Sequence, residues 1–199
     1  TRSAATIAYH SSVNRTWGLV LHLCAREFKA AAILELGSCA GISGSYLALA
    51  PACRRLVTIE ASAMLASLAE HNLSRVSQRA EVHRGFVEDV LPRVLPTFEN
   101  GVDLAFIDAR HEREATLGYW RVLRPRLNEG GLVIFDDIRW SHGMWQAWNT
   151  VRRQAGLSCT LDLGRFGVCL CDSSATTADY YNFAVYAGWL RVHRQDRSS

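Results

Sequence analysis

The fold is decided by the stretch ILELGSCAGISG, residues 33–44. Its apolar first part, within Ala32–Gly37, is rich in residues that favour β-strands, and a helix is predicted from Ile42 to Ala50, where Pro51 ends it. The glycines between them permit a tight turn and bring backbone N–H groups close to a ligand at the helix start. The segment therefore predicts a strand–loop–helix unit with a ligand at its loop. A plain strand-to-helix turn is the alternative, because a glycine-rich loop alone is weak evidence.

Short apolar runs alternate with amphipathic stretches along the rest of the chain, a rhythm typical of a parallel α/β sheet. Further strands are predicted at 56–60, 80–84, 102–107 and 132–135, with helices at 62–76, 87–95, 112–127 and 143–154. Strands at 159–163 and 166–170 are joined by Gly164-Arg165, which indicates a hairpin. A helix at 13–28 is predicted to cover the sheet. We expect a Rossmann-like, doubly wound α/β fold with a mostly parallel seven-stranded sheet and an antiparallel C-terminal hairpin.

Length and composition agree with one globular domain. The chain has 199 residues, of which 49% are hydrophobic and 21% charged, and these proportions exclude global disorder. No apolar run approaches the roughly 20 residues of a membrane span. The first residues, Thr1–Thr6, contain no basic stretch followed by an apolar segment, so no secretory signal is expected.

The basic and sulfur-containing residues limit the partners and the compartment. The net charge is +3, Lys29 is the only lysine, and the arginines are scattered between acids, so nucleic acid is not the expected partner. None of the six cysteines forms a CxxC pair, which argues against a disulfide scaffold and a structural zinc site. Reduced thiols in a cytoplasmic protein are the expectation.

An acid at the end of the second strand strengthens the case for a nucleotide-like ligand. Glu60 lies about 20 residues past the loop, where a carboxylate can accept hydrogen bonds from ribose hydroxyls. A solvated strand-end carboxylate is the alternative. Loop and acid together fit either a dinucleotide or S-adenosylmethionine. The dinucleotide fingerprint requires GxGxxG, whereas this loop has Gly37-x-x-x-Gly41, with Glu35 two residues before it.

The pattern E-x-G-x-x-x-G resembles the cofactor loop of class I S-adenosylmethionine-dependent methyltransferases, in particular the small-molecule O-methyltransferases. The resemblance implies that Ser43 holds the methionine carboxylate and Glu60 the ribose. It places the adenine at Phe86 and Val87, where this chain lacks the polar pair often found in the family. The cofactor-binding residues that it implies are Glu35, Gly37, Ser38, Cys39, Gly41, Ser43, Glu60, Ala61, Phe86, Val87 and Asp108.

Three acids at strand ends predict a cation site. Asp108 ends the fourth strand, and Asp136 and Asp137 end the fifth. Clustered carboxylates repel one another unless a cation neutralises them, and Mg²⁺ is bound by a few carboxylates together with water and substrate oxygens. We therefore expect Mg²⁺ or a similar divalent ion on Asp108, Asp136 and Asp137. The alternative for either of the last two is a side chain that caps the following turn.

His111, three residues after Asp108, is the predicted general base. A histidine can accept the proton of a hydroxyl that a metal ion has made more acidic. The spacing Asp-x-x-His followed by Asp-Asp resembles divalent-metal-dependent O-methyltransferases acting on sugar hydroxyls, whereas catechol and caffeoyl-type relatives place a lysine there. The alternative for His111 is a side chain at the start of the next helix. His142 is a second candidate.

The resemblance covers roughly residues 30–172 and implies metal-assisted O-methylation of a small hydroxyl-bearing acceptor, a sugar or a catechol-like phenol. Two other classes remain open: a nicotinamide-dinucleotide oxidoreductase, which the loop spacing disfavours, and a non-catalytic binding module. We expect one domain over 1–199, comprising an N-terminal helical cap (1–29), a cofactor-binding core (30–172) and an aromatic tail (173–199). The tail is predicted either to cover the active site or to form a homodimer surface.

Overall fold

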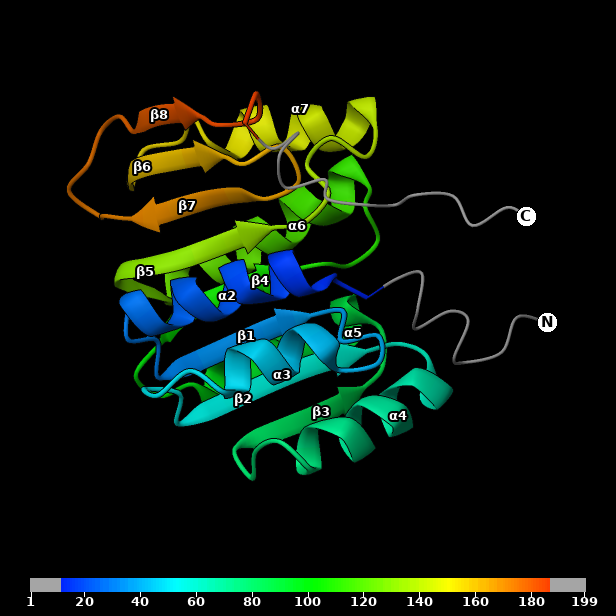
Figure 1. The fold of residues 1–199 in the computed structure, drawn as a ribbon. Helices are drawn as coiled ribbons and strands as arrows, with labels where there is room; N and C mark the ends of the chain where they lie inside the picture. Colours follow the sequence, from blue (N-terminus) through cyan, green and yellow to red (C-terminus); the bar gives the residue numbers. More distant parts are fainter. Residues whose placement is uncertain (1–11, 187–199) are drawn as a thin grey trace, which may run out of the picture.

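A single eight-stranded sheet forms the centre of the molecule in the computed structural model, which describes residues 12–186 (Figure 1). The strand order is β3-β2-β1-β4-β5-β7-β6-β8. Strands β1 to β5 are parallel, β7 is antiparallel to both β5 and β6, and β8 is parallel to β6. The strands are β1 (Ala32–Leu36), β2 (Arg55–Glu60), β3 (Ala80–Arg84), β4 (Val102–Ile107), β5 (Leu127–Phe135), β6 (Leu157–Asp162), β7 (Gly167–Cys171) and β8 (Asp179–Asn182).

The expected fold class is confirmed, but the expectation of seven strands is wrong by one. The additional strand, β8, lies in the predicted aromatic tail and pairs Tyr180 with Thr160 of β6. Without it the backbone groups of β6 would form an open sheet edge, and a tyrosine-rich stretch suits an edge strand. Residues 187–199 of the tail and 1–11 of the predicted N-terminal cap lie outside the described residues.

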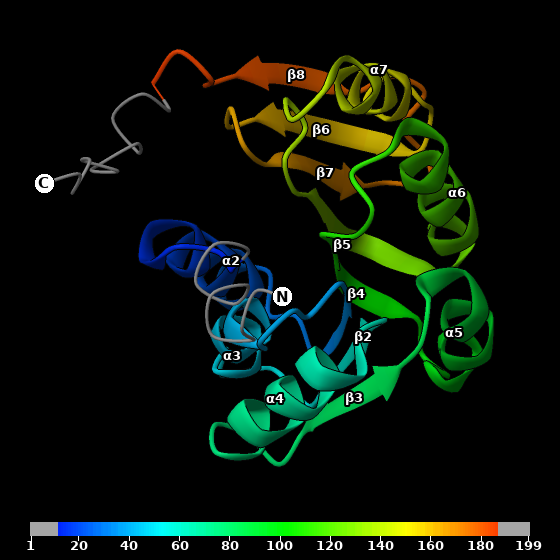
Figure 2. The same cartoon turned by 90° about the vertical axis from the view of Figure 1, so that its right-hand side faces the viewer.

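Six helices in the described region cover the two faces of the sheet, as Figure 2 shows. One layer contains α2 (Arg15–Glu27), α3 (Ile42–Ala48) and α4 (Ala63–Ser74), and the other contains α5 (Val87–Val94), α6 (Arg113–Leu123) and α7 (His142–Val151). Each layer packs on its own apolar core, one around Leu21, Ile33 and Phe106 and the other around Trp120 and Phe135. This is the doubly wound arrangement that the alternating strands and helices predicted.

Two predicted boundaries are wrong by four residues or more. The helix expected over 112–127 ends at Leu123, because Pro125 cannot continue it and a short 3₁₀ turn, η2 (Arg124–Arg126), follows. Strand β5 begins at Leu127 rather than 132 and passes through Gly130, whose φ of +71° accompanies an irregular pairing with β4. Glycine tolerates that backbone conformation inside a strand.

The ends of β1, β2, β4 and β5 lie at one edge of the sheet. Their hydrogen bonds continue past the strands, from Asp108 N–H to the carbonyl of Leu36 at 2.8 Å and from Asp136 N–H to the carbonyl of Ile107 at 2.9 Å. The strand order reverses between β1 and β4, and ligands of open α/β sheets bind beside such a switch point. Within residues 12–186, no helix is long and apolar enough to cross a membrane.

Candidate active site

The glycine-rich loop lies against the end of β4. Gly37 has a φ of +93°, and a Cβ at this position would be 2.1 Å from the carbonyl oxygen of Asp108. Gly41, with a φ of +77°, is the N-cap of α3, and its Cβ would be 3.1 Å from the Cα of Ala69. Glycine at position 37 therefore lets the loop approach the end of β4, and glycine at position 41 lets it approach α4. Ser38 is buried and Cys39 half-buried in the same loop.

Glu60 joins this loop to the turn after β2. One carboxylate oxygen accepts the N–H of Cys39 at 2.9 Å, and the other accepts the N–H of Ser62 at 2.8 Å. The side chain is half-buried, and Ala61 beside it is exposed. These contacts place Glu60 beside the loop, where the expected ribose contact requires it, and that contact stays a prediction.

Glu35 and Ser43 lie beneath the loop rather than at its surface. Both residues are buried, at 0% and 5% exposure, and a Cβ on Gly44 would be 2.8 Å from a Glu35 carboxylate oxygen. Burial raises the pKa of Glu35 from 4.5 to about 7, although the neighbouring Ser43 and Thr58 hydroxyls oppose the increase. The structure thus brings these two residues together, and their contacts with a cofactor stay predictions.

The two predicted adenine contacts have different surroundings. Phe86 is 60% exposed and precedes α5, whereas Val87 is 7% exposed and packs in the core. The residue that follows β3 lies close to the end of β2, because the N–H of Gly85 donates to the carbonyl of Glu60 at 2.9 Å. Of the pair, Phe86 has the ring surface available for stacking.

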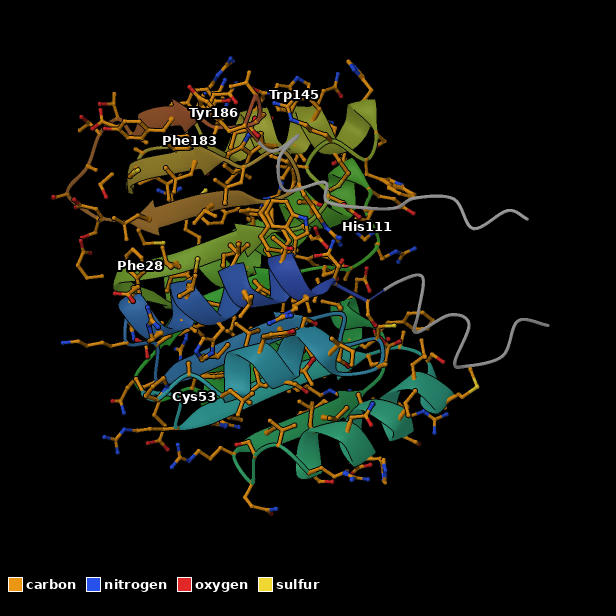
Figure 3. The ribbon with its side chains drawn as sticks, in the orientation of Figure 1. Phe28, Cys53, His111, Trp145, Phe183 and Tyr186 are labelled. Carbon is orange, nitrogen blue, oxygen red and sulfur yellow. The ribbon has the colours of Figure 1, made fainter. Side chains whose placement is uncertain are left out.

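The predicted acids and the predicted base converge at the ends of β4 and β5. His111 Nε2 lies 3.2 Å from Asp108 Oδ1 and 3.6 Å from Asp137 Oδ2. Within the described residues, ligand atoms of Asp108, His111 and Asp136 all lie within 4.8 Å of one another. Figure 3 shows His111 at this edge, far from Phe28 at the other end of the sheet. The donor set of carboxylates and an imidazole suits a divalent cation.

The acids and the histidine alter one another's proton affinity. Burial raises the pKa of Asp108 well above its usual range, and the charge of Asp136 raises it further, while His111 opposes both. Contact with Asp108 raises the pKa of His111, and partial burial opposes that increase. The charged forms of Asp108 and His111 therefore favour each other.

Arg165 is the residue that sequence reasoning missed. Its Nε donates to Asp136 Oδ1 and its Nη2 to Asp136 Oδ2, both at 2.6 Å, and Nε lies 3.4 Å from Asp137 Oδ1. The β6–β7 turn brings it to the site, because β7 is antiparallel to β5 and Gly167 pairs with Phe135. The sequence indicated the Gly164-Arg165 hairpin, but it did not indicate where this hairpin lies in the strand order.

The backbone around these residues is strained. Five non-glycine residues in the described region have a positive φ, and four of them lie at this edge: Cys39, Arg110, His111 and Asp137, with φ between +32° and +58°. Such conformations persist where the surrounding structure enforces them, and they cluster at functional sites.

Trp140, 71% exposed, has its ring 6.0 Å from that of His111 and provides an apolar wall. His142 is exposed at the start of α7, with Nε2 2.9 Å from Gln146 Nε2.

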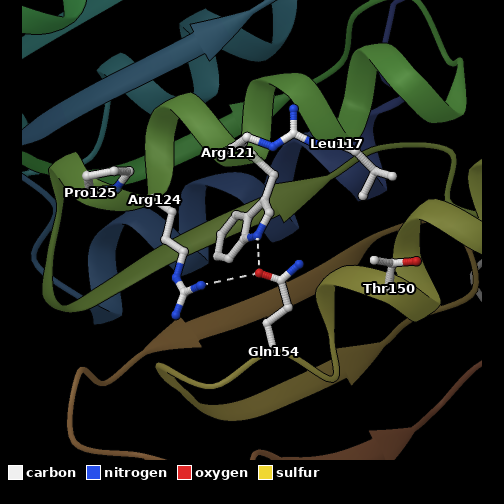
Figure 4. Close-up of a pocket in the computed structure, with 7 residues that line it drawn as sticks. Leu117, Arg121, Arg124, Pro125, Thr150 and Gln154 are labelled. Carbon is white, nitrogen blue, oxygen red and sulfur yellow. Dashed lines mark hydrogen bonds between the residues drawn. The ribbon is translucent and has the colours of Figure 1, made fainter.

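A cavity of about 500 Å³ lies elsewhere, between α6 and α7 (Figure 4). Its lining includes Trp120, whose indole N–H donates to Gln154 Oε1 at 2.9 Å, and Arg124, which contacts the same oxygen at 3.3 Å. None of its seven lining residues belongs to the predicted site.

Comparison with known proteins identifies the family. A family model described as "Methyltransferase domain" matches residues 34–138, which is just over half of the chain. This range includes the glycine-rich loop, His111 and all three acids. The chain belongs to this methyltransferase domain family, and its fold is that of class I S-adenosylmethionine-dependent methyltransferases.

Individual relatives agree with this assignment. The chain is 32% identical over 132 residues to a catechol O-methyltransferase of Niastella koreensis and 33% identical over 131 residues to one of Mycobacterium tuberculosis; each match covers 64% of this chain. The chain spans 58% and 57% of these relatives, respectively. A solved O-methyltransferase of Bacillus cereus in complex with S-adenosylhomocysteine is 26% identical, with a TM-score of 0.67 and coverage of 84% of both chains.

Proposed function

We propose that this domain methylates a hydroxyl group of a small acceptor with S-adenosylmethionine as methyl donor. The observation that supports it most is the position of the His111–Asp108 pair, which lies at the switch point against the glycine-rich loop. A side chain that can accept a proton thus lies beside the predicted cofactor site. The catechol O-methyltransferase relatives support a phenolic acceptor, while the histidine in place of a lysine keeps a sugar as the alternative.

His111 is the proposed general base. Its Nε2 lies 3.2 Å from Asp108 Oδ1, and with the imidazole proton on this nitrogen, Nδ1 would be the atom that accepts the hydroxyl proton. When bound, S-adenosylmethionine would supply a sulfonium methyl group, and transfer of this methyl to the acceptor oxygen would break the carbon–sulfur bond and leave S-adenosylhomocysteine, a neutral thioether. Proximity and alignment supply much of the acceleration for so reactive a donor.

A divalent cation at the acids is part of the proposal. Asp108, Asp136 and Asp137 are the residues that would hold it. Ligand atoms of Asp108 and Asp136 lie within 4.8 Å of each other and of His111, and Asp137 Oδ2 lies 3.6 Å from His111 Nε2, so these oxygen donors fit such an ion. When bound, the ion would make the acceptor hydroxyl more acidic. The contact of Arg165 with both oxygens of Asp136 is the feature of this site that opposes the ion.

The test separates cofactor binding, activity and the metal. Isothermal titration with S-adenosylhomocysteine measures cofactor binding. Turnover of S-adenosylmethionine with catechol and with a sugar panel measures activity. Repetition of the turnover assay with Mg²⁺ and with a chelator measures the dependence on a metal ion. We expect binding, methylated product and inhibition by the chelator. Absence of S-adenosylhomocysteine binding would refute the methyltransferase proposal, whereas chelator-insensitive turnover would refute only the role of the metal.

A further inference from the structure

The ion pair between Arg165 and Asp136 joins the β6–β7 turn to the end of β5. Asp136 is fully buried, and Arg165 is 26% exposed. Two parallel N–H donors on one carboxylate form the strongest common type of protein ion pair. The pair therefore neutralises, from within the chain, one of the charges that a metal ion would neutralise.

The turn that carries Arg165 is fixed on several sides. Gly164 N–H donates to Asp162 Oδ1 at 2.8 Å, and Ile138 N–H donates to the carbonyl of Arg165 at 3.1 Å. Arg139 binds the other oxygen of Asp162 at 2.6 Å. The backbone of Arg165 is thus held to the loop after β5, and only its side chain has to move for the guanidinium to leave Asp136.

The acceptor capacity of Asp136 is largely used. Oδ1 accepts from Arg165 Nε and from the N–H of Asp137, the latter at 2.7 Å, and Oδ2 accepts from Arg165 Nη2. A cation that binds Asp136 would meet the guanidinium at close range, where two positive charges repel strongly because the site is largely buried. Cation binding and the Arg165–Asp136 pair therefore oppose each other.

We infer that Arg165 is a built-in counter-cation of the acid cluster that weakens the binding of a divalent metal ion by pairing with Asp136. The inference rests on the proposed function, which assigns the metal to these acids. In this arrangement Arg165 stabilises the cluster when no ion is bound, and its guanidinium would have to leave Asp136 for an ion to bind there. Arg165 is a positioning residue for the cluster, since its contacts are with the acids.

The test measures Mn²⁺ affinity directly, by electron paramagnetic resonance of free Mn²⁺ titrated into the full chain. We expect Arg165→Met to lower the dissociation constant about tenfold and Arg165→Lys, which keeps the charge but loses the paired donors, about threefold. Arg110→Met is the matched control, because it removes one positive charge beside His111 from an exposed pair with Glu88. We expect it to change the constant by less than about twofold.

Each outcome decides the inference. Arg165→Met leaves the buried carboxylate of Asp136 without its partner, so circular dichroism checks that this variant folds. If Arg165→Met does not fold, the Mn²⁺ affinity of Arg165→Lys decides the inference. The inference is overturned if the Arg165 variants bind Mn²⁺ as tightly as wild type or more weakly. It is also overturned if Arg110→Met gains as much affinity as the Arg165 variants, or if none of these proteins binds Mn²⁺. Titration of the same samples with S-adenosylhomocysteine shows separately whether the methyltransferase proposal stands.

Discussion

The two halves of the site are built in different ways. The proposed cofactor half, from the β1 loop to Glu60, is held by backbone groups of consecutive strand–helix units, such as the Cys39 N–H that donates to Glu60. The proposed acceptor half is a group of charged side chains: Asp108, His111, Asp136, Asp137 and Arg165. Backbone binding tolerates many side chains, whereas a charge cluster depends on each member. Substitutions should therefore separate cofactor binding from turnover.

The largest effect is expected in the acceptor half. His111→Ala removes the proposed base and should lower kcat about 10²- to 10⁴-fold, while the affinity for S-adenosylhomocysteine changes less than about twofold. Steady-state kinetics with catechol and calorimetry measure the two quantities. His71→Ala, at an exposed position on α4, is the control and should retain kcat. An unchanged kcat in His111→Ala contradicts the role of this residue.

The second prediction concerns the boundary between the halves. Gly37→Ala places a Cβ 2.1 Å from the Asp108 carbonyl oxygen at a φ of +93°, so it should lower the free energy of unfolding by about 3 kcal/mol and weaken both binding and turnover. Gly118→Ala is the matched control, because nothing lies within 4 Å of its Cβ position on α6. It should stabilise the protein by about 0.5–1 kcal/mol. Urea unfolding measures both, and equal stability of the two variants would contradict the close approach.

The third prediction is a pH dependence that originates beneath the cofactor half. Burial raises the pKa of Glu35 from 4.5 to about 7, so the folded state binds its proton more tightly than the unfolded state. The resulting stability is present below the unfolded pKa and is lost as pH rises through the folded value. Wild type should therefore lose about 3 kcal/mol more than Glu35→Gln between pH 4.5 and 8. Urea unfolding across this range measures the difference.

The control for Glu35 is Glu70→Gln, which replaces an exposed carboxyl group on α4. Its stability should follow that of wild type at every pH. Parallel pH curves for wild type and Glu35→Gln would show that Glu35 does not cause the slope.

The smallest effect is expected at the rim of the cofactor half. Phe86→Ala removes an exposed ring that is predicted to contact the adenine, and it should weaken S-adenosylhomocysteine binding about fivefold without affecting the KM of the acceptor. Phe28→Ala removes an exposed ring at the other end of the sheet and serves as the control. If both variants bind equally well, the adenine does not contact Phe86.

Much of the fold was predictable because its signals are local. The apolar run of β1, the turn residues Gly37 and Gly41, and Ser62 as a helix cap each act within a few positions of the chain. Alternation of strands and helices then implies a doubly wound sheet, and that fold class was confirmed. The prediction missed β8, because its pairing with β6 depends on the return of the chain after β7 rather than on a local signal.

The sequence by itself determined which residues end the strands, and therefore that Asp108, Asp136 and Asp137 lie at one edge with His111 near them. Parallel strands connected by helices always bring their carboxyl ends to the same side. Only the tertiary structure decided that Arg165 joins them, since it lies 29 positions from Asp136 and reaches it through the pairing of β7 with β5. Charges at close range act through space, so the partner of a carboxylate depends on which strands are neighbours and not on distance along the chain.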